Sequence, residues 1–202
     1  MTESDKIHYM KSQDLLLITD MQNVYLENQT WACLDTHGAA ANILKIARFL
    51  PEKNVLITEF LPPKNFGAWE TYNKKYAEIN SSVYLNQLIP EIEALSSVYP
   101  LYKKSVYSSM KIPQVKKRCI KATKAGGRIL VTGVVAECCV LSTVFDAMDY
   151  GCKLIYLTDA VSGFTKEKED AVILTLSGLS PVHLSIMTTE EYLKEKFQGE
   201  KK

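Results

Sequence analysis

Six short apolar runs, separated by helix-like segments, constrain the fold of this chain more than any other feature. The runs occupy residues 14–20, 54–60, 98–103, 128–134, 152–158 and 181–187. Segments with helical spacing of apolar residues lie between or after them, at residues 39–50, 114–125, 138–150, 166–179 and 190–197. Strands that are apolar throughout are typical of a parallel sheet covered on both faces. The sequence therefore predicts a single-domain α/β fold with three layers: an open, mostly parallel six-stranded sheet with helices on both faces.

The chain is long enough for one substantial core and shows no linker between domains. Its 202 residues are 47% apolar and 23% charged, which is ordinary for a globular domain. We expect an N-terminal arm at residues 1–12, one domain at residues 13–198 and a short tail at residues 199–202. Pro62 and Pro63 open an irregular or partly helical segment that extends to residue 86. We expect this segment to shape the substrate pocket.

The overall charge excludes several classes of partner. The formal net charge is +1, which gives no reason to expect binding to nucleic acid or to a membrane surface. No apolar run approaches the roughly 18 residues of a membrane span. The five cysteines are odd in number and show no paired CxxC spacing; they are Cys33, Cys119, Cys138, Cys139 and Cys152. Together with a polar N-terminus, they predict a cytoplasmic protein with free thiols.

Three kinds of polar side chain follow predicted strands. Asp20 ends the first strand, Lys103 and Lys104 end the third, and Cys139 follows the fourth. In open parallel sheets, ligands bind outside the carboxyl ends of the strands. A carboxylate, an ammonium group and a thiol at one sheet edge form an acid/base and nucleophile set. The sequence therefore predicts a candidate active site at this edge.

The thiol lies in the first turn of a predicted helix. The positive end of the helix dipole and the free N–H groups of that turn favour the thiolate, which is the reactive form. Cys138 is adjacent to Cys139, and a helix turns by about 100° per residue. We therefore expect only one of the two cysteines to face the site, and the residue pattern does not decide which one.

Other polar residues admit a structural interpretation. Asp20 could be a helix cap or turn residue, and capping is the preferred reading of Asp159, which follows the fifth predicted strand. His8, His37 and His183 are scattered, with His37 on a loop and His183 inside a strand. They indicate neither a Cys–His pair nor a metal site.

Aromatic residues also lie near the ends of the predicted strands. Tyr25, Trp69 and Tyr107 are the ones we expect to line a substrate pocket, with Phe66 and Tyr72 close by. Most aromatic residues pack in cores or on surfaces. Pockets for flat or apolar ligands are nevertheless often lined by such rings.

Three motifs resemble those of a known family. They are Leu-Ile-Thr-Asp-Met-Gln-Asn at residues 17–23, Lys-Ser-Val-Tyr-Ser-Ser at residues 104–109 and Gly-Val-Val-Ala-Glu-Cys-Cys-Val at residues 133–140. In order and spacing, the chain from about residue 14 to residue 187 resembles the isochorismatase-like cysteine hydrolases. This family includes nicotinamidase, N-carbamoylsarcosine amidase and ureidoacrylate amidohydrolase.

The resemblance implies roles for particular residues. It makes Asp20 and Lys104 catalytic and chooses Cys139 as the nucleophile. It also implies a cis peptide between Val134 and Val135, and an oxyanion hole formed by the backbone N–H groups of Val135 and Cys139. Family members are commonly dimers or tetramers, so we expect a homodimer or homotetramer.

The resemblance does not extend to the metal site of the family. Metal-dependent nicotinamidases carry an Asp-x-His pattern after the second strand, whereas this chain has Thr-Glu-Phe-Leu-Pro-Pro at residues 58–63. We therefore expect no metal and no other cofactor. Siderophore-type isochorismatases lack the nucleophilic cysteine, so Cys139 also argues against vinyl-ether hydrolysis.

These observations predict a metal-independent cysteine hydrolase. The expected substrate is a small-molecule amide, carbamoyl or ureido compound, whose C–N bond is cleaved through a thioester. One alternative is a nicotinamidase- or pyrazinamidase-type amidase with altered or absent metal binding. Another is a non-catalytic binding member of the fold. A thiol-redox role is disfavoured, because adjacent cysteines form a strained ring when bridged.

Overall fold

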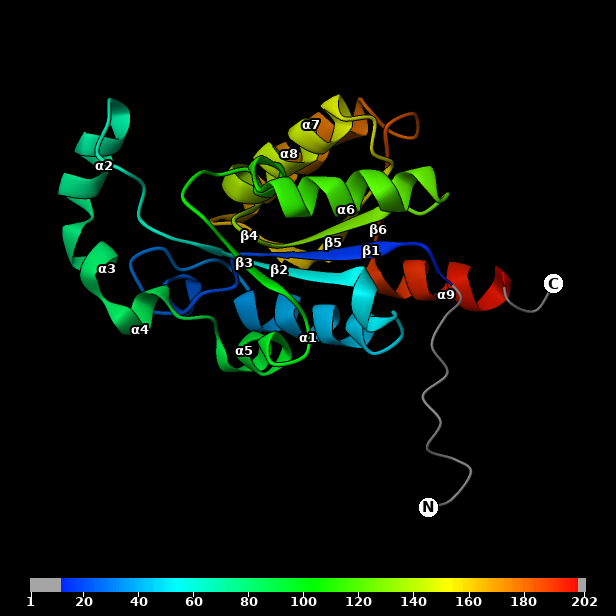
Figure 1. The fold of residues 1–202 in the computed structure, drawn as a ribbon, viewed down its shortest axis with the longest axis horizontal. Coiled ribbons are helices and arrows are strands. Elements are labelled where there is room, and N and C mark those ends of the chain that lie inside the picture. Colours follow the sequence, from blue (N-terminus) through cyan, green and yellow to red (C-terminus); the bar gives the residue numbers. More distant parts are fainter. Residues whose placement is uncertain (1–11, 200–202) are drawn as a thin grey trace, which may run out of the picture.

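A computed structural model describes residues 12–199 of the chain (Figure 1). The arm predicted at residues 1–12 therefore lies outside the described residues except for its last residue. His8 and residues 200–202 of the predicted tail also lie outside them.

The six predicted strands form one sheet. Their bounds are β1 Leu15–Thr19, β2 Val55–Phe60, β3 Leu101–Lys104, β4 Ile129–Val134, β5 Leu154–Ser162 and β6 Leu184–Met187. The strand order is β3-β2-β1-β4-β5-β6, and all five pairings are parallel. The predicted fold class is confirmed, with a sheet that is wholly rather than mostly parallel.

Helices cover both faces of this sheet (Figure 1). One face carries α1 Thr36–Ala47, α5 Pro90–Ser96 and α9 Thr189–Gly199, and the other carries α6 Pro113–Lys124, α7 Leu141–Asp149 and α8 Lys166–Ser177. The side chains of β1 alternate between the two layers of core. Leu16 and Ile18 pack in the layer that contains α1, whereas Leu15 and Leu17 pack in the layer that contains α6. Burial on both faces is the reason that the central strands β1, β2 and β4 are largely apolar.

The connections reverse direction at the centre of the sheet. From β1 the chain builds outward to β2 and β3, and it then returns to place β4 on the other side of β1. The carboxyl ends of β1 and β4 therefore flank the switch point at which open α/β sheets bind their ligands. Asp20 follows β1 here, and Cys139 follows β4.

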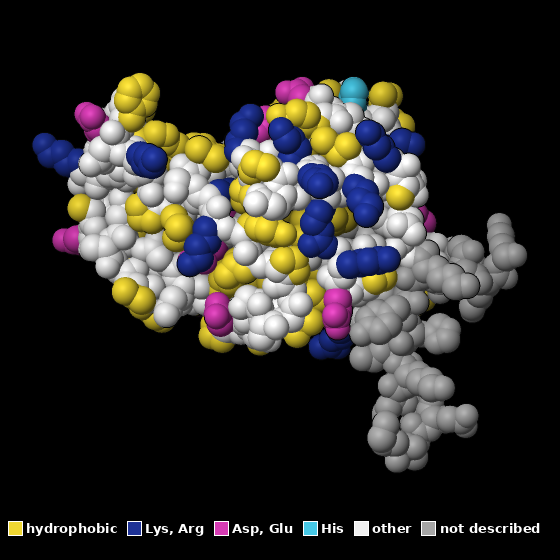
Figure 2. Space-filling model, in the orientation of Figure 1, with side chains coloured by type: hydrophobic (Ala, Val, Ile, Leu, Met, Phe, Trp, Pro, Cys, Tyr) yellow, Lys and Arg dark blue, Asp and Glu magenta, His cyan; other side chains and the backbone are white. Residues whose placement is uncertain are grey.

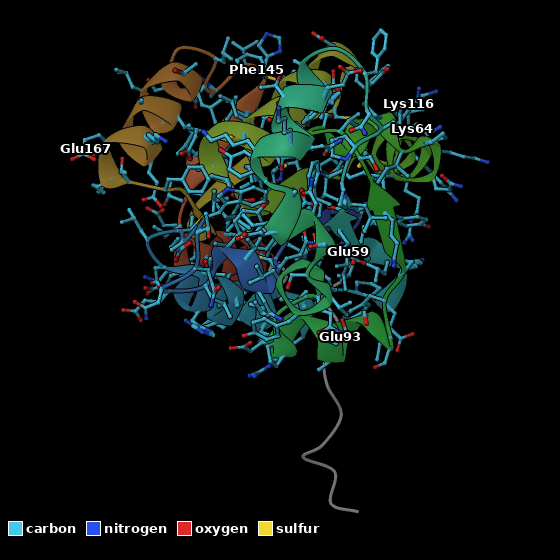
Figure 3. The ribbon with its side chains drawn as sticks, turned by 90° about the vertical axis from the view of Figure 1, so that its left-hand side faces the viewer. Glu59, Lys64, Glu93, Lys116, Phe145 and Glu167 are labelled. Carbon is cyan, nitrogen blue, oxygen red and sulfur yellow. The ribbon has the colours of Figure 1, made fainter. Side chains whose placement is uncertain are left out.

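The segment between β2 and α5 forms three short helices. They are α2 Ala68–Lys75, α3 Ala77–Ser81 and α4 Val83–Asn86. Figure 1 shows them extending beyond the carboxyl ends of the strands, and in Figure 3 they cross the front of the molecule. The sequence predicts this segment as only partly helical, and it does not predict α5.

Several boundaries differ from those predicted. The structure begins α1 three residues earlier, β3 three residues later and β6 three residues later. Short 3-10 turns occupy Asn23–Tyr25, Glu52–Asn54 and Ser109–Lys111, and a π-helical turn at Ala136–Val140 precedes α7. Strand β5 extends four residues beyond its predicted end, because its pairing with β4 shifts register between Val131 and Gly133.

Helix α6 is amphipathic, with a strongly basic outward face. The helix buries Val115 and Cys119. Figure 2 shows a cluster of Lys and Arg side chains over its outward face. Lys121 and Lys124 lie in its last turn, where positive charge complements the negative end of the helix dipole. Within residues 12–199, no helix is long and apolar enough to cross a membrane.

Candidate active site

Asp20 directly follows β1 at the switch point. Its φ is +52°, in the left-handed region that Asp enters more readily than most residues. Its backbone N–H donates to the carbonyl oxygen of Thr58 on β2, at 3.0 Å. The side chain has no exposed surface. A carboxylate buried in this way requires charged or hydrogen-bonding partners.

Lys104 supplies the charged partner. It is the last residue of β3, and its ammonium group crosses the end of β2 to pair with Oδ2 of Asp20. Its Nζ also donates to the carbonyl oxygens of Val106, at 3.1 Å, and Tyr107, at 2.8 Å. These three acceptors match the three protons of the ammonium group. The ion pair between Lys104 and Asp20 is therefore buried and has defined geometry.

The neighbouring lysine points the other way. Lys103 pairs with Glu59 (Nζ to Oε2, 3.5 Å), and its side chain is 59% exposed, against 1% for Lys104. The register places Lys103 opposite Glu59 and Lys104 opposite Phe60. Side chains alternate along a strand, and here Lys104, and not Lys103, points toward Asp20.

The turn after β4 brings the cysteine pair toward Asp20. At Gly133 φ is +103°, and an added Cβ atom would lie 2.1 Å from the carbonyl oxygen of Thr19. Only glycine allows β4 to approach β1 this closely. The peptide between Val134 and Val135 is cis, as the family resemblance implies, and the π-helical turn that carries both cysteines follows it. π-Helical turns occur frequently at functional sites.

The two cysteines differ in their surroundings. Both line the cavity described below, so the expectation that only one of them faces the site is wrong. The charges of Asp20 and Lys104 act on the thiol of Cys139, whereas Glu137 and Lys168 are the charged groups that act on Cys138. Cys139 is therefore the cysteine that the structure brings together with Asp20 and Lys104.

Burial controls the protonation of the Cys139 thiol. It raises the pKa of the Cys139 thiol well above its usual value; the charge of Asp20 raises it further, and that of Lys104 lowers it. The thiolate expected from the helix-start position is therefore disfavoured at rest, and the thiol keeps its proton. Burial alone would lower the pKa of Lys104, but the negative charge of Asp20 and the hydrogen bond to its carboxylate outweigh burial and raise that pKa, which keeps the ammonium group charged.

The thiol of Cys139 opens into an aromatic cavity of about 220 Å³. Its lining residues are Tyr25, Trp31, Phe60, Tyr72, Tyr76, Tyr107, Val135, Cys138, Cys139 and Phe164. They come from the loop after β1, the end of β2, helix α2, the loops after β3 and β5, and the turn after β4. The cavity therefore collects residues from almost the whole carboxyl edge of the sheet.

The predicted pocket residues divide into two groups. Tyr25 and Tyr107 line this cavity, whereas Trp69 is not among its lining residues. Its ring packs against those of Tyr72 and Tyr107, with centroids 5.2 and 5.3 Å apart. Trp69 lies three residues before Tyr72 and seven before Tyr76, which is helical spacing. This spacing is the signal in the sequence that could have indicated a contribution of α2 to the cavity.

The remaining polar candidates lie in other interactions. Oδ1 of Asp159 accepts hydrogen bonds from the backbone N–H and the hydroxyl of Thr189, both at 2.8 Å, at the start of α9. Asp159 lies inside β5 and holds the start of α9, which is distant in sequence, rather than capping α8, the next helix along the chain. His37 lies in α1 with Nδ1 2.8 Å from Oε1 of Glu91, and His183 directly precedes β6.

The residues after β2 offer no metal ligands at the predicted position. Phe60 contributes its ring to the cavity, and Leu61 and Pro62 have no coordinating atoms. The carboxylate of Glu59 is engaged by Lys103. Among the described residues, no group of three or more His, Cys, Asp or Glu side chains is arranged to hold a metal ion.

Comparison with known proteins identifies the class. The Isochorismatase domain model matches residues 14–191, so the chain belongs to the isochorismatase family of hydrolases. It is similar to the uncharacterized isochorismatase family protein YddQ of Bacillus subtilis (strain 168). The two are 25% identical over 194 residues, which cover 89% of this chain and 98% of YddQ.

Solved structures share the fold. A cysteine hydrolase from Pseudomonas syringae pv. phaseolicola superposes with a TM-score of 0.71 and 17% identity, over 92% of this chain and 93% of that one. A pyrazinamidase of Pyrococcus horikoshii in complex with zinc gives a TM-score of 0.63 and 18% identity, over 87% and 99% of the two chains. At these identities the likeness concerns the fold.

Proposed function

We propose that the protein is a cysteine hydrolase that cleaves the C–N bond of a small amide, carbamoyl or ureido compound through a thioester. The observation that carries the proposal is the placement of Cys139 between the buried ion pair of Asp20 and Lys104 and the aromatic cavity. A thiol, a carboxylate and an ammonium group at one cavity wall are a nucleophile, a base and a stabilising charge.

The first half of the reaction forms the thioester. Asp20 takes the proton of the thiol as the sulfur of Cys139 attacks the substrate carbonyl. The carbonyl electron pair moves onto oxygen, where the backbone N–H groups of Val135 and Cys139 would stabilise the negative charge. When the intermediate collapses, the C–N bond breaks and Asp20 returns its proton to the leaving nitrogen. Ammonia or an amine departs, and an acyl–sulfur bond remains.

Water completes the second half. Asp20 takes a proton from a water molecule as the water oxygen attacks the thioester carbonyl. The C–S bond then breaks, and Asp20 passes the proton to the sulfur of Cys139. The buried, protonated thiol makes a base necessary in the first step. Lys104 remains charged throughout and stabilises the carboxylate and the developing thiolate.

The residues that line the cavity favour a substrate with an uncharged, flat acyl group. Seven of its ten lining residues carry aromatic rings, and none of the ten is Arg, Lys, Asp or Glu. A substrate carboxylate placed among these rings would lose water without pairing with a cationic side chain of the cavity lining, which is costly. This favours a neutral aromatic amide over carbamoyl or ureido acids.

A pyrazinamidase-type amidase is therefore the second candidate. The ring-lined cavity favours it, because a flat heteroaromatic amide would fit between such walls. The side chains after β2 oppose a metal-dependent version, since Phe60, Leu61 and Pro62 cannot bind zinc or iron. Only a metal-dependent version of this second candidate would differ from the first in requiring a metal for activity.

The test is ammonia release from a panel of amides after prolonged EDTA treatment. The panel contains benzamide, pyrazinamide and nicotinamide, together with a carbamoyl amino acid and a ureido acid. We expect turnover of at least one neutral amide, with kcat/KM about tenfold or more above that of the acids. Loss of activity that zinc, manganese or iron restores would reject the metal-independent mechanism. Failure to release ammonia from any compound would favour the non-catalytic binding reading.

Replacing the proposed base gives a sharper prediction. Asp20→Asn keeps the shape of the side chain but removes the base, so kcat should fall by on the order of a hundredfold or more. Glu59→Gln is the matched control, because its carboxylate lies at the end of β2 and pairs with Lys103 instead of facing the cavity. It should retain most of the wild-type rate. Circular dichroism should show both variants folded, and near wild-type turnover by Asp20→Asn would contradict the assigned role.

A further inference from the structure

The second oxygen of the Asp20 carboxylate has its own partner. Lys104 pairs with Oδ2, and the hydroxyl of Thr58 donates to Oδ1 at 2.8 Å. Thr58 lies on β2, has no exposed surface and is not among the residues that line the cavity. It therefore contacts the proposed base from the protein interior, away from any substrate.

The donor directions in this interior contact can be assigned. An ionised carboxylate is only an acceptor, so the single hydroxyl proton of Thr58 goes to Oδ1 of Asp20. Oγ of Ser109 lies 3.2 Å from Oγ1 of Thr58. Because Thr58 has no second proton, Ser109 must be the donor in that contact. Ser109 thereby fixes the orientation of the Thr58 hydroxyl.

The same chain of contacts reaches the nucleophile. The backbone N–H of Ser109 donates to Oγ1 of Thr143 at 2.9 Å, and that hydroxyl donates to the carbonyl oxygen of Cys139 at 2.7 Å. Thr58, Ser109 and Thr143 all have no exposed surface. A dry polar network that is fully paired is rigid, and breaking one member is costly. This one connects the carboxylate of the base to the turn of the nucleophile.

We propose that Thr58 is a positioning residue for the reaction, which holds the Asp20 carboxylate in the orientation that receives the proton of Cys139. The inference rests on the proposed function, in which Asp20 is the base. An Asp side chain has two rotatable bonds, and contacts at both carboxylate oxygens hold that of Asp20 in one orientation. Lys104 holds one oxygen, and Thr58 holds the other.

The chain offers a matched control on the neighbouring strand. Thr19 is the register partner of Thr58 in the pairing of β1 with β2, and it directly precedes Asp20. It is equally buried, but its hydroxyl is without a hydrogen-bond partner among the described residues. Thr19→Val and Thr58→Val are therefore the same change of atoms at paired positions. They differ in whether a hydrogen bond to the carboxylate is lost.

The kinetic experiment uses the best substrate of the amide panel. A hydrogen bond to a charged group contributes about 1.5–3 kcal/mol, so Thr58→Val should lower kcat by about 10- to 100-fold. Its KM should change little, because Thr58 does not line the cavity. Thr58→Ser restores the hydroxyl and should recover most of kcat, and Thr19→Val should stay near wild type. Equal losses in the two valine variants, or no rescue by serine, would overturn the proposal.

Crystal structures of the same variants provide a readout that needs no substrate. The carboxylate of Asp20 should be rotated in Thr58→Val and unchanged in Thr58→Ser and Thr19→Val. An unmoved carboxylate in Thr58→Val would overturn the proposal even if activity fell. If the wild type hydrolyses no amide, the proposed function fails, and the crystal structures still decide the role of Thr58. Should Thr58→Val not fold, Ser109→Ala must lower kcat severalfold without a change in KM, and no such loss would overturn the proposal.

Discussion

Cys139→Ala is expected to abolish turnover, while Cys138→Ala should leave most of it. Both thiols border the same cavity, so position in the pocket does not separate them. Their electrostatic partners do, because Asp20 and Lys104 act on Cys139, whereas Glu137 and Lys168 act on Cys138. Without the sulfur of Cys139 no thioester can form. The rate of ammonia release by Cys139→Ala should therefore be indistinguishable from that of the uncatalysed reaction.

Covalent trapping gives an independent measurement of the same assignment. Peptide mass spectrometry after brief incubation with a substrate should find the acyl group on Cys139. The rate at which iodoacetamide modifies Cys139 should also rise with pH, because burial raises the pKa of the thiol and the thiolate is the form that reacts. An acyl group on Cys138, together with activity that survives in Cys139→Ala, would contradict the assignment.

The sheet and the edge that carries the site could be predicted from the sequence, because both depend on local patterns. Apolar runs locate the strands, and parallel strands place residues such as Asp20, Lys104 and Cys139 at one edge. Alternation along β3 also predicts that Lys103 and Lys104 point in opposite directions, as their different partners show. Each of these inferences needs only the residues of one strand and the general geometry of a sheet.

Burial could not be predicted in the same way. The first turn of a helix favours a thiolate, but the raised pKa of Cys139 results from side chains that pack around it from several elements. Thr58 reads in the sequence as an ordinary β-branched strand residue. Its importance appears only when the sheet places it beside Asp20. These features depend on contacts between segments that are distant along the chain.

The residues that form the cavity wall could not be predicted from local sequence patterns either. Tyr72 belongs to α2 and Tyr76 directly follows it, and none of the residues of α2 is buried, so its sequence carries little of the apolar signal of a core helix. Their place in the cavity lining, together with Tyr25 and Phe60, follows from the course of the segment that contains α2, α3 and α4, which no local pattern determines. Asp159 is a related case, since a register shift between β4 and β5 extends the strand through it.

Lys104→Met is expected to remove turnover and to destabilise the fold, whereas Lys103→Met should do neither. Removing one partner of a buried ion pair leaves an uncompensated charge, at a cost of about 3–5 kcal/mol in the free energy of unfolding. The side chain of Lys103 is 59% exposed and its Nζ lies 3.5 Å from Oε2 of Glu59, so water screens this pair, and such pairs contribute about 0–1 kcal/mol. Urea unfolding followed by circular dichroism measures both changes, and equal losses in the two variants would contradict the different environments of the lysines.

A double variant separates the stability of this pair from its chemistry. Lys104→Met combined with Asp20→Asn removes both charges, so it should be more stable than Lys104→Met alone, because no unpaired carboxylate remains in the interior. It should remain inactive, since it lacks both the base and the positive charge that stabilises the thiolate. Recovery of stability without recovery of turnover would show that the pair is retained for catalysis. A double variant that is no more stable than Lys104→Met would mean that the lysine stabilises the fold by packing and through its hydrogen bonds to Val106 and Tyr107, rather than through Asp20.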